Sequence, residues 1–217
     1  MITDLSVAQF FTIHPDNPQL RLIRQAVGII RGGGVVVSPT DSCYALGCHI
    51  GDKAAMERIR AIREVDARHH FGLLCRDLAE AATYARIDDA QFRLIRAATP
   101  GSYTFILHAT REVPRRLLHP RRKTIGVRIP AHRVAQALLA ELGEPLLSST
   151  LILPGDSAPL DDAQDIRTRL EHRVDVILDA GPCGVVPTTV VDLTSGVPVI
   201  TRQGKGSAKL FGETIGA

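Results

Sequence analysis

The stretch that decides the fold is Gly32-Gly33-Gly34-Val35-Val36-Val37-Ser38-Pro39-Thr40-Asp41-Ser42-Cys43-Tyr44-Ala45-Leu46-Gly47. A run of glycines leads into a short β-branched strand, which stops in a turn rich in hydroxyl groups. Strands that end in a polar turn present backbone N–H groups and hydroxyls at the sheet edge where α/β proteins bind ligands. The stretch therefore predicts a strand beside a ligand site. A strand and turn without any such role is the alternative that the pattern leaves open.

Helical and strand patterns alternate along the whole chain around this stretch. Apolar spacing predicts helices over 18–31, 52–63 and 161–171, one that ends at 142 before Gly143, and two that open at Asp77 and Asp88. Strands are predicted over 35–37, 71–75, 103–108, 124–129, 146–153, 174–178, 189–193 and 197–201. The last two are separated closely enough by Ser195-Gly196 for a hairpin. We therefore expect an α/β domain with a twisted, mixed sheet flanked by helices and a concave basic cleft.

Composition is typical of one globular domain. The chain has 217 residues, of which 45% are hydrophobic and 23% charged. We expect a single domain over 1–217, with a core over about 14–204 and a loose tail in the last dozen residues. The four cysteines form no CxxC pair, which favours free thiols in an intracellular protein. No signal peptide or long apolar segment is present, so we expect a soluble cytoplasmic protein without a membrane partner. The oligomeric state stays open.

A strongly basic segment runs from Arg111 to Arg128, with seven cations in eighteen positions. Such a segment attracts phosphate or RNA, although charge runs are also common on solvated surface loops. The candidate RNA-binding residues are Arg115, Arg116, Arg121, Arg122 and Lys123.

Arg128 differs from the other cations because it lies within an apolar strand. A buried arginine needs an anionic partner, and we expect a ligand carboxylate or phosphate. The turn at 179–184 is a second, weaker candidate for phosphate binding because it lacks a Walker lysine. His69-His70 is a poor metal site because adjacent side chains diverge, and no metal is expected.

Taken together, these motifs resemble the YrdC-like family of threonylcarbamoyl-adenylate synthases, which carries a GG-(V/I)-(V/I)-x-x-P-T-(E/D)-T-x-Y-G-L-G element. Further matches follow in the family's order at 100–104, 127–130, 181–192 and 201–204, so the resemblance spans nearly the whole chain. The segments 10–18, 114–118 and 122–126 are most similar to the YciO branch of this family.

Two family motifs are altered. The K-x-R pair falls at Arg63-Glu64-Val65, so its lysine is an arginine and its arginine is lost. The S-x-N turn falls at Thr150-Leu151-Ile152, so its asparagine is lost. These groups hold nucleotide phosphates in the synthases, and their loss implies weak or altered activity.

The resemblance implies a nucleotidyltransferase that joins L-threonine, bicarbonate and ATP, with Mg²⁺ carried on the ATP, into threonylcarbamoyl-AMP and pyrophosphate. That product feeds the t6A modification of tRNA. Arg63 and Arg128 are the implied catalytic residues. The implied substrate- and nucleotide-binding residues are Thr40, Tyr44, Thr104, Ser149, Thr150, Thr188, Thr189 and Arg202. The alternative is a protein that binds double-stranded RNA or tRNA without synthase activity.

Overall fold

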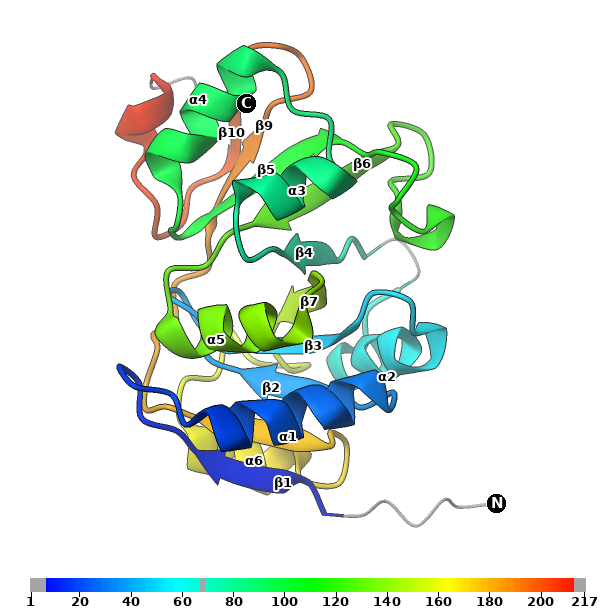
Figure 1. The fold of residues 1–217 in the computed structure, drawn as a ribbon, viewed down its shortest axis with the longest axis vertical. Coiled ribbons are helices and arrows are strands. Elements are labelled where there is room, and N and C mark those ends of the chain that lie inside the picture. The colour runs from blue at the N-terminus through cyan, green and yellow to red at the C-terminus, as the bar shows by residue number, and fades with distance from the viewer. Residues whose placement is uncertain (1–6, 67–68, 213–217) are drawn as a thin grey trace.

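A ten-stranded mixed sheet organises the protein (Figure 1). The computed structural model describes residues 7–66 and 69–212. The strand order is β1-β8-β2-β3-β7-β4-β6-β5-β9-β10, in which parallel and antiparallel pairs both occur. The predicted α/β class and mixed sheet are confirmed. The strands are β1 Gln9–Thr12, β2 Val36–Ser38, β3 Ala45–His49, β4 Gly72–Leu74, β5 Tyr103–His108, β6 Thr124–Arg128, β7 Leu146–Thr150, β8 Val176–Asp179, β9 Thr189–Asp192 and β10 Val199–Arg202.

Six α-helices and two 3-10 turns flank the sheet in the described part of the chain. Asp52, Asp77 and Asp88 each cap a helix by accepting a hydrogen bond from a backbone N–H, as the sequence predicts. The α-helices are α1 Leu20–Arg31, α2 Lys53–Arg63, α3 Leu78–Tyr84, α4 Asp89–Ala98, α5 Arg133–Leu142 and α6 Ala163–Leu170. The 3-10 turns are η1 Arg115–Leu117 and η2 Ala208–Phe211.

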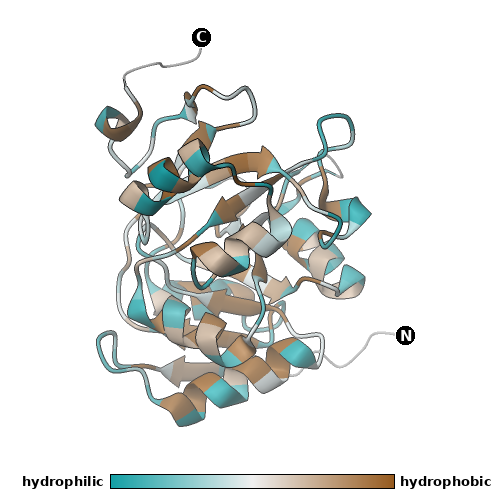
Figure 2. Ribbon diagram, turned by 45° about the horizontal axis from the view of Figure 1, so that its top comes forward, coloured by the Kyte–Doolittle hydropathy of each residue, from teal (hydrophilic) through white to brown (hydrophobic). Residues whose placement is uncertain are grey.

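Successive strand residues face opposite sides of the sheet, and each side has its own apolar cluster. Val36, Leu146 and Val176 pack with the buried faces of α1 and α5. On the other side Val37 and Leu147 pack in the cluster that also holds the apolar residues of α2 and α6. Figure 2 shows that the strands are mainly hydrophobic, whereas the helices carry both hydrophobic and hydrophilic residues. Burial on both faces explains why these strands read as continuous apolar runs.

Two strands were missed by the sequence analysis. β3 follows the hydroxyl-rich turn directly, and its sequence Ala-Leu-Gly-Cys-His has little β-propensity. Gly47 is required there because a Cβ would lie 2.5 Å from the Leu146 side chain on neighbouring β7. β1 is a short edge strand of four residues before the predicted start of the core. Tertiary packing, and not local propensity, makes both segments strands.

The end of the described chain is more ordered than the predicted loose tail. η2 lies within the last dozen residues, and Phe211 is buried against the rings of Tyr103 and Phe105, at 5.6 and 6.0 Å between centroids. The predicted hairpin is confirmed, since β9 and β10 pair antiparallel. Phe211 therefore anchors η2 to the core.

We predict that Phe211→Ala lowers the free energy of unfolding by about 3 kcal/mol, because it removes a buried ring and leaves a cavity. Urea denaturation at pH 7 measures the change. Leu210→Ala is the matched control, since Leu210 is the neighbouring residue and 48% exposed, and it should change stability little. Equal effects of the two substitutions would mean that the packing of η2 contributes nothing specific.

Candidate functional site

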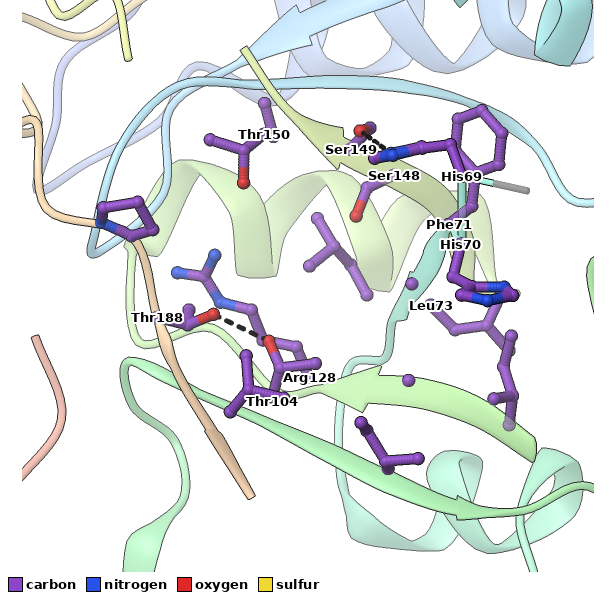
Figure 3. A pocket seen from close by; sticks show the side chains of 18 of the residues that line it. His69, His70, Phe71, Leu73, Thr104, Arg128, Ser148, Ser149, Thr150 and Thr188 are labelled. Atoms are coloured by element: carbon purple, nitrogen blue, oxygen red, sulfur yellow. Dashed lines mark hydrogen bonds between the residues drawn. The ribbon is translucent and has the colours of Figure 1, made fainter. Parts of the chain in front are cut away.

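A cavity of about 300 Å³ is lined by residues of β3, β7, β4, β6, β5 and β9, which are neighbouring strands in the sheet. Ser148, Ser149 and Thr150 of β7 form one wall, and Thr104 of β5 and Thr188, just before β9, form the opposite wall (Figure 3). This volume is at the lower end of the range for small-molecule sites. The cavity is therefore lined with hydroxyl groups that converge from segments far apart in the sequence.

The cavity is basic. Among the described residues that line it, none is Asp or Glu. A field of this kind in a partly enclosed site favours an anionic ligand over a cation. The lining cations and imidazoles are Arg63, Arg122, Arg128, Arg202, His69, His70 and His119.

Arg128 stands at the end of β6 with its side chain only 9% exposed. Its Nη2 donates hydrogen bonds to Thr40 Oγ1 at 3.0 Å and to Asp41 Oδ1 at 2.7 Å. Its Nε is buried and has no hydrogen-bond partner. The guanidinium is thus fixed on one side by the protein and retains an unpaired, buried donor on another.

Asp41 supplies the counter-charge of Arg128, and the sequence analysis did not assign it a role. Its carboxylate also accepts hydrogen bonds from Ser102 Oγ at 2.6 Å and from the Ala131 N–H at 3.1 Å. Burial alone would raise the pKa of Asp41, but the Arg128 charge and these hydrogen bonds outweigh it and lower the pKa below 3.8. The sequence feature that could have indicated this role is the position of Asp41 directly after Thr40, in the hydroxyl-rich turn that follows the first predicted strand.

Thr40 and Tyr44 support the site from behind, since neither is among the residues that line the cavity. Both are fully buried. Thr40 Oγ1 donates to the Cys43 carbonyl, and Tyr44 Oη donates to the Gly181 carbonyl at 2.9 Å, which ties the first turn to the second glycine-rich turn. Contact of these two residues with an amino acid stays a prediction. Cys43 and Ala45 reach the cavity in their place.

Arg63, at the end of α2, reaches the cavity through a second polar cluster. Its Nε donates to the Ile152 carbonyl at 3.3 Å, and its Nη1 lies 2.9 Å from His69 Nε2 and in a close hydrogen bond with Ser149 Oγ. Burial, followed by the nearby Arg63 charge, lowers the pKa of His69 to about 4. His69 was considered only as a metal ligand at the sequence level, and nothing in the pattern indicated this contact.

The altered family motifs lie only partly on the cavity wall. Arg63, Thr150 and Ile152 line it, and Val65 does not. An apolar Ile152 side chain therefore faces the space where the family pattern has an amide.

Thr104, Thr188 and Arg202 form a third cluster. The two threonine hydroxyls are 2.8 Å apart, and Arg202 Nη2 donates to the Thr188 carbonyl at 3.0 Å. All three residues line the cavity. Thr189 does not, because it is fully buried and donates to the Gly206 carbonyl at 2.6 Å.

The basic segment is divided between structural and exposed cations. Arg116 donates to the Gly51 carbonyl, and Arg122, which lines the cavity, pairs with Asp192 at 3.0 Å. Arg115, Arg121 and Lys123 are exposed. Exposed cations therefore lie in the same loop as Leu117, His119 and Arg122, which line the cavity.

A family model named for Sua5, YciO and YrdC, and described as telomere recombination, matches residues 28–204. The chain belongs to this family. The family resemblance seen in the motifs is thus confirmed over most of the chain.

Relatives within the Sua5/YciO/YrdC family carry different names. The uncharacterized protein YciO of Escherichia coli is 57% identical over 205 residues, which are 94% of this chain and 100% of that protein. The crystal structure of E. coli YciO superimposes with a TM-score of 0.91, over 94% of this chain and 99% of that one.

The name of one more distant relative and the bound ligand of another both contain threonine. A putative threonylcarbamoyl-AMP synthase of Mycobacterium tuberculosis is 33% identical over 199 residues, which are 90% of each chain. The structure of P. abyssi Sua5 complexed with L-threonine is 26% identical with a TM-score of 0.86, and the match covers 95% of this chain and 62% of that one.

Within residues 7–66 and 69–212, no cluster of three or more His, Cys, Asp or Glu side chains is arranged to hold a metal ion. No helix in this part of the chain is both long and apolar enough to cross a bilayer.

We predict that Asp41→Asn lowers the free energy of unfolding at pH 7 by about 3 kcal/mol, because it leaves the buried Arg128 charge uncompensated. The pKa of Asp41 is lowered from 3.8 in the folded state, so the pair stabilises the protein fully above pH 3.8 and progressively loses its effect as the pH falls from there through the lower pKa of the folded state. The stability difference between wild type and variant should therefore shrink on acidification. Urea denaturation between pH 3 and pH 7 measures it.

Asp16→Asn is the control for that experiment, because Asp16 and its partner Arg133 are 75% and 68% exposed. Exposed pairs contribute at most about 1 kcal/mol. An Asp41 variant as stable as the Asp16 variant would show that the buried pair is not needed.

Proposed function

We propose that the cavity binds ATP and L-threonine and forms threonylcarbamoyl-AMP from them and bicarbonate, releasing pyrophosphate, with reduced turnover. The observation that carries this proposal is the cavity's chemistry: arginines and hydroxyls converge on it, no carboxylate lines it in the described chain, and buried Arg128 Nε lacks a partner. The names of the distant relatives support the same reaction. In this proposal the product feeds the t6A modification of tRNA.

The reaction requires that the substrates be positioned for attack and that negative charge on the phosphoryl oxygens be stabilised. L-Threonine and bicarbonate form a carbamate with loss of water, and the carbamate oxygen attacks the α-phosphate of ATP while pyrophosphate leaves on the opposite side. Arg63, Arg128 and Arg202 line the cavity and would stabilise the charge on the phosphoryl oxygens. Mg²⁺ would enter with ATP and be held through its phosphates, because the described walls offer no carboxylate ligand.

Reduced turnover follows from the altered motifs in this proposal. Ile152 places an apolar group on the wall and Val65 lies away from it, so one cation and one amide of the family pattern are missing. Cationic contacts that strengthen in the transition state affect the rate more than they affect ground-state binding. We therefore expect ATP to bind and to react slowly.

RNA binding without chemistry is the second candidate, and the exposed side chains of Arg115, Arg121 and Lys123 favour it. Phosphate contacts by exposed cations give binding that weakens steeply with salt. The two candidates thus place the ligand contacts on different residues.

The deciding experiment measures pyrophosphate release from ATP with and without threonine and bicarbonate, beside double-stranded RNA binding at low and high salt. Release that depends on both small substrates supports the synthase. Salt-sensitive RNA binding with no such release would overturn it in favour of the second candidate.

We predict that Arg202→Gln weakens ATP binding about tenfold, because it removes a cation from the wall without leaving a buried carboxylate unpaired. Calorimetry with ATP measures the change. Arg121→Gln is the matched control, since Arg121 is exposed and does not line the cavity, and it should leave ATP affinity within about twofold. Equal losses in both variants would indicate only a general effect of net charge.

A further inference from the structure

Arg63 is held by a closed group of three side chains. Its Nη1 contacts His69 Nε2 at 2.9 Å and Ser149 Oγ, and His69 Nε2 and Ser149 Oγ are themselves 2.9 Å apart. The bond between His69 and Ser149 is drawn in Figure 3. The Ile152 carbonyl accepts from Arg63 Nε. Both sides of the guanidinium are therefore fixed by partners from β7, from the segment before β4 and from the turn after β7.

The direction of each hydrogen bond follows from chemistry. A guanidinium remains protonated and can only donate, so His69 Nε2 accepts from Arg63 and carries no proton. The imidazole is then neutral, with its proton on Nδ1. Ser149 Oγ accepts from Arg63 and lies 2.9 Å from the same Nε2, whose single lone pair is engaged by Arg63.

A protonated His69 would break this arrangement, because it would offer a donor where an acceptor is needed and would place two cations together. The surroundings oppose that state. Burial and then Arg63, His70 and Arg60 lower the pKa of His69, and Asp66 raises it more weakly, to a value of about 4. The acceptor is thus present throughout the physiological pH range.

Nη2 of Arg63 makes no hydrogen bond to any described residue, although the side chain lines the cavity. We propose that His69 is a positioning residue that, together with Ser149, holds Arg63 so that Nη2 donates to a phosphate in the cavity. This inference rests on the proposed function. It gives a role to His69, which lies outside the family motifs. By fixing Arg63, the remaining cation of the altered K-x-R pair, His69 offsets part of the effect of losing the second cation.

The network also discriminates between arginine and lysine at position 63. Lysine has one nitrogen and could not donate at once to the Ile152 carbonyl, to His69 and to a ligand phosphate in the geometry of a planar fork. Arg63→Lys, which restores the family residue, should therefore weaken ATP binding in this protein.

The test compares His69→Leu with His69→Gln, whose amide oxygen can still accept from Arg63. We expect His69→Leu to weaken ATP binding about tenfold, to leave adenosine binding unchanged, and His69→Gln to recover most of the ATP affinity. His108→Leu, an exposed histidine at the end of β5, controls for loss of an imidazole. Because His69 acts through Arg63, His69→Leu should add little to Arg63→Gln in a double-mutant cycle.

Three outcomes would overturn the proposal: unchanged ATP affinity in folded His69→Leu, equal losses for ATP and adenosine, or additive effects in the cycle. The ¹⁵N spectrum of the wild-type imidazole at pH 7 is an independent readout that needs no variant to fold. A neutral Nδ1–H tautomer supports the arrangement, and an Nε2–H tautomer or an imidazolium overturns it. If wild type binds no ATP, the proposed function fails, and the spectrum still decides how His69 meets Arg63.

Discussion

The ion pair between Asp41 and Arg128 is the constraint on which the rest of the site depends. Arg128 closes a central strand and Asp41 lies in the turn after β2, so the pair joins the two halves of the sheet across the cavity. The Asp41 carboxylate also accepts hydrogen bonds from Ser102 Oγ and the Ala131 N–H, and the Asp41 carbonyl accepts one from Lys205 Nζ. The Asp41 carboxylate thus holds three segments of the chain together, because a buried charge in a low dielectric is costly unless its lone pairs find donors.

That pair also explains why the cavity can remain basic. Asp41 pairs with Arg128 and Asp192 pairs with Arg122, and neither carboxylate lines the cavity. The other two lining arginines, Arg63 and Arg202, are held by carbonyls and hydroxyls, which fix a guanidinium without cancelling its charge. Arg202 on the Thr188 carbonyl and Arg63 on the Ile152 carbonyl follow the same rule. Preorganised cations of this kind cost little reorganisation when an anion enters.

Much of the fold could be predicted from local pattern, whereas the site could be predicted only in part. Three aspartate caps and the alternation of buried strands with amphipathic helices have strong local signals. The strand Ala45–His49 has none, because its strand conformation depends on antiparallel pairing with β2 and with β7, which is about 100 residues away in sequence. Arg128 was found because a cation among β-branched residues is unusual. Asp41 was not assigned its role because its partner Arg128 lies 87 residues away, at the end of β6. His69 was not assigned its role because its contact with Arg63, six residues away, depends on how the chain turns after α2.

The position of β8 has a consequence for how the chain acquires this structure during synthesis. β8 lies between β1 and β2 and pairs in parallel with both. Until Val176–Asp179 has left the ribosome, β1 and β2 lack the strand that lies between them. The sheet cannot be completed before then, and the edges of these strands stay unpaired. Folding is therefore governed by contacts distant in sequence, and a topology of this kind folds slowly.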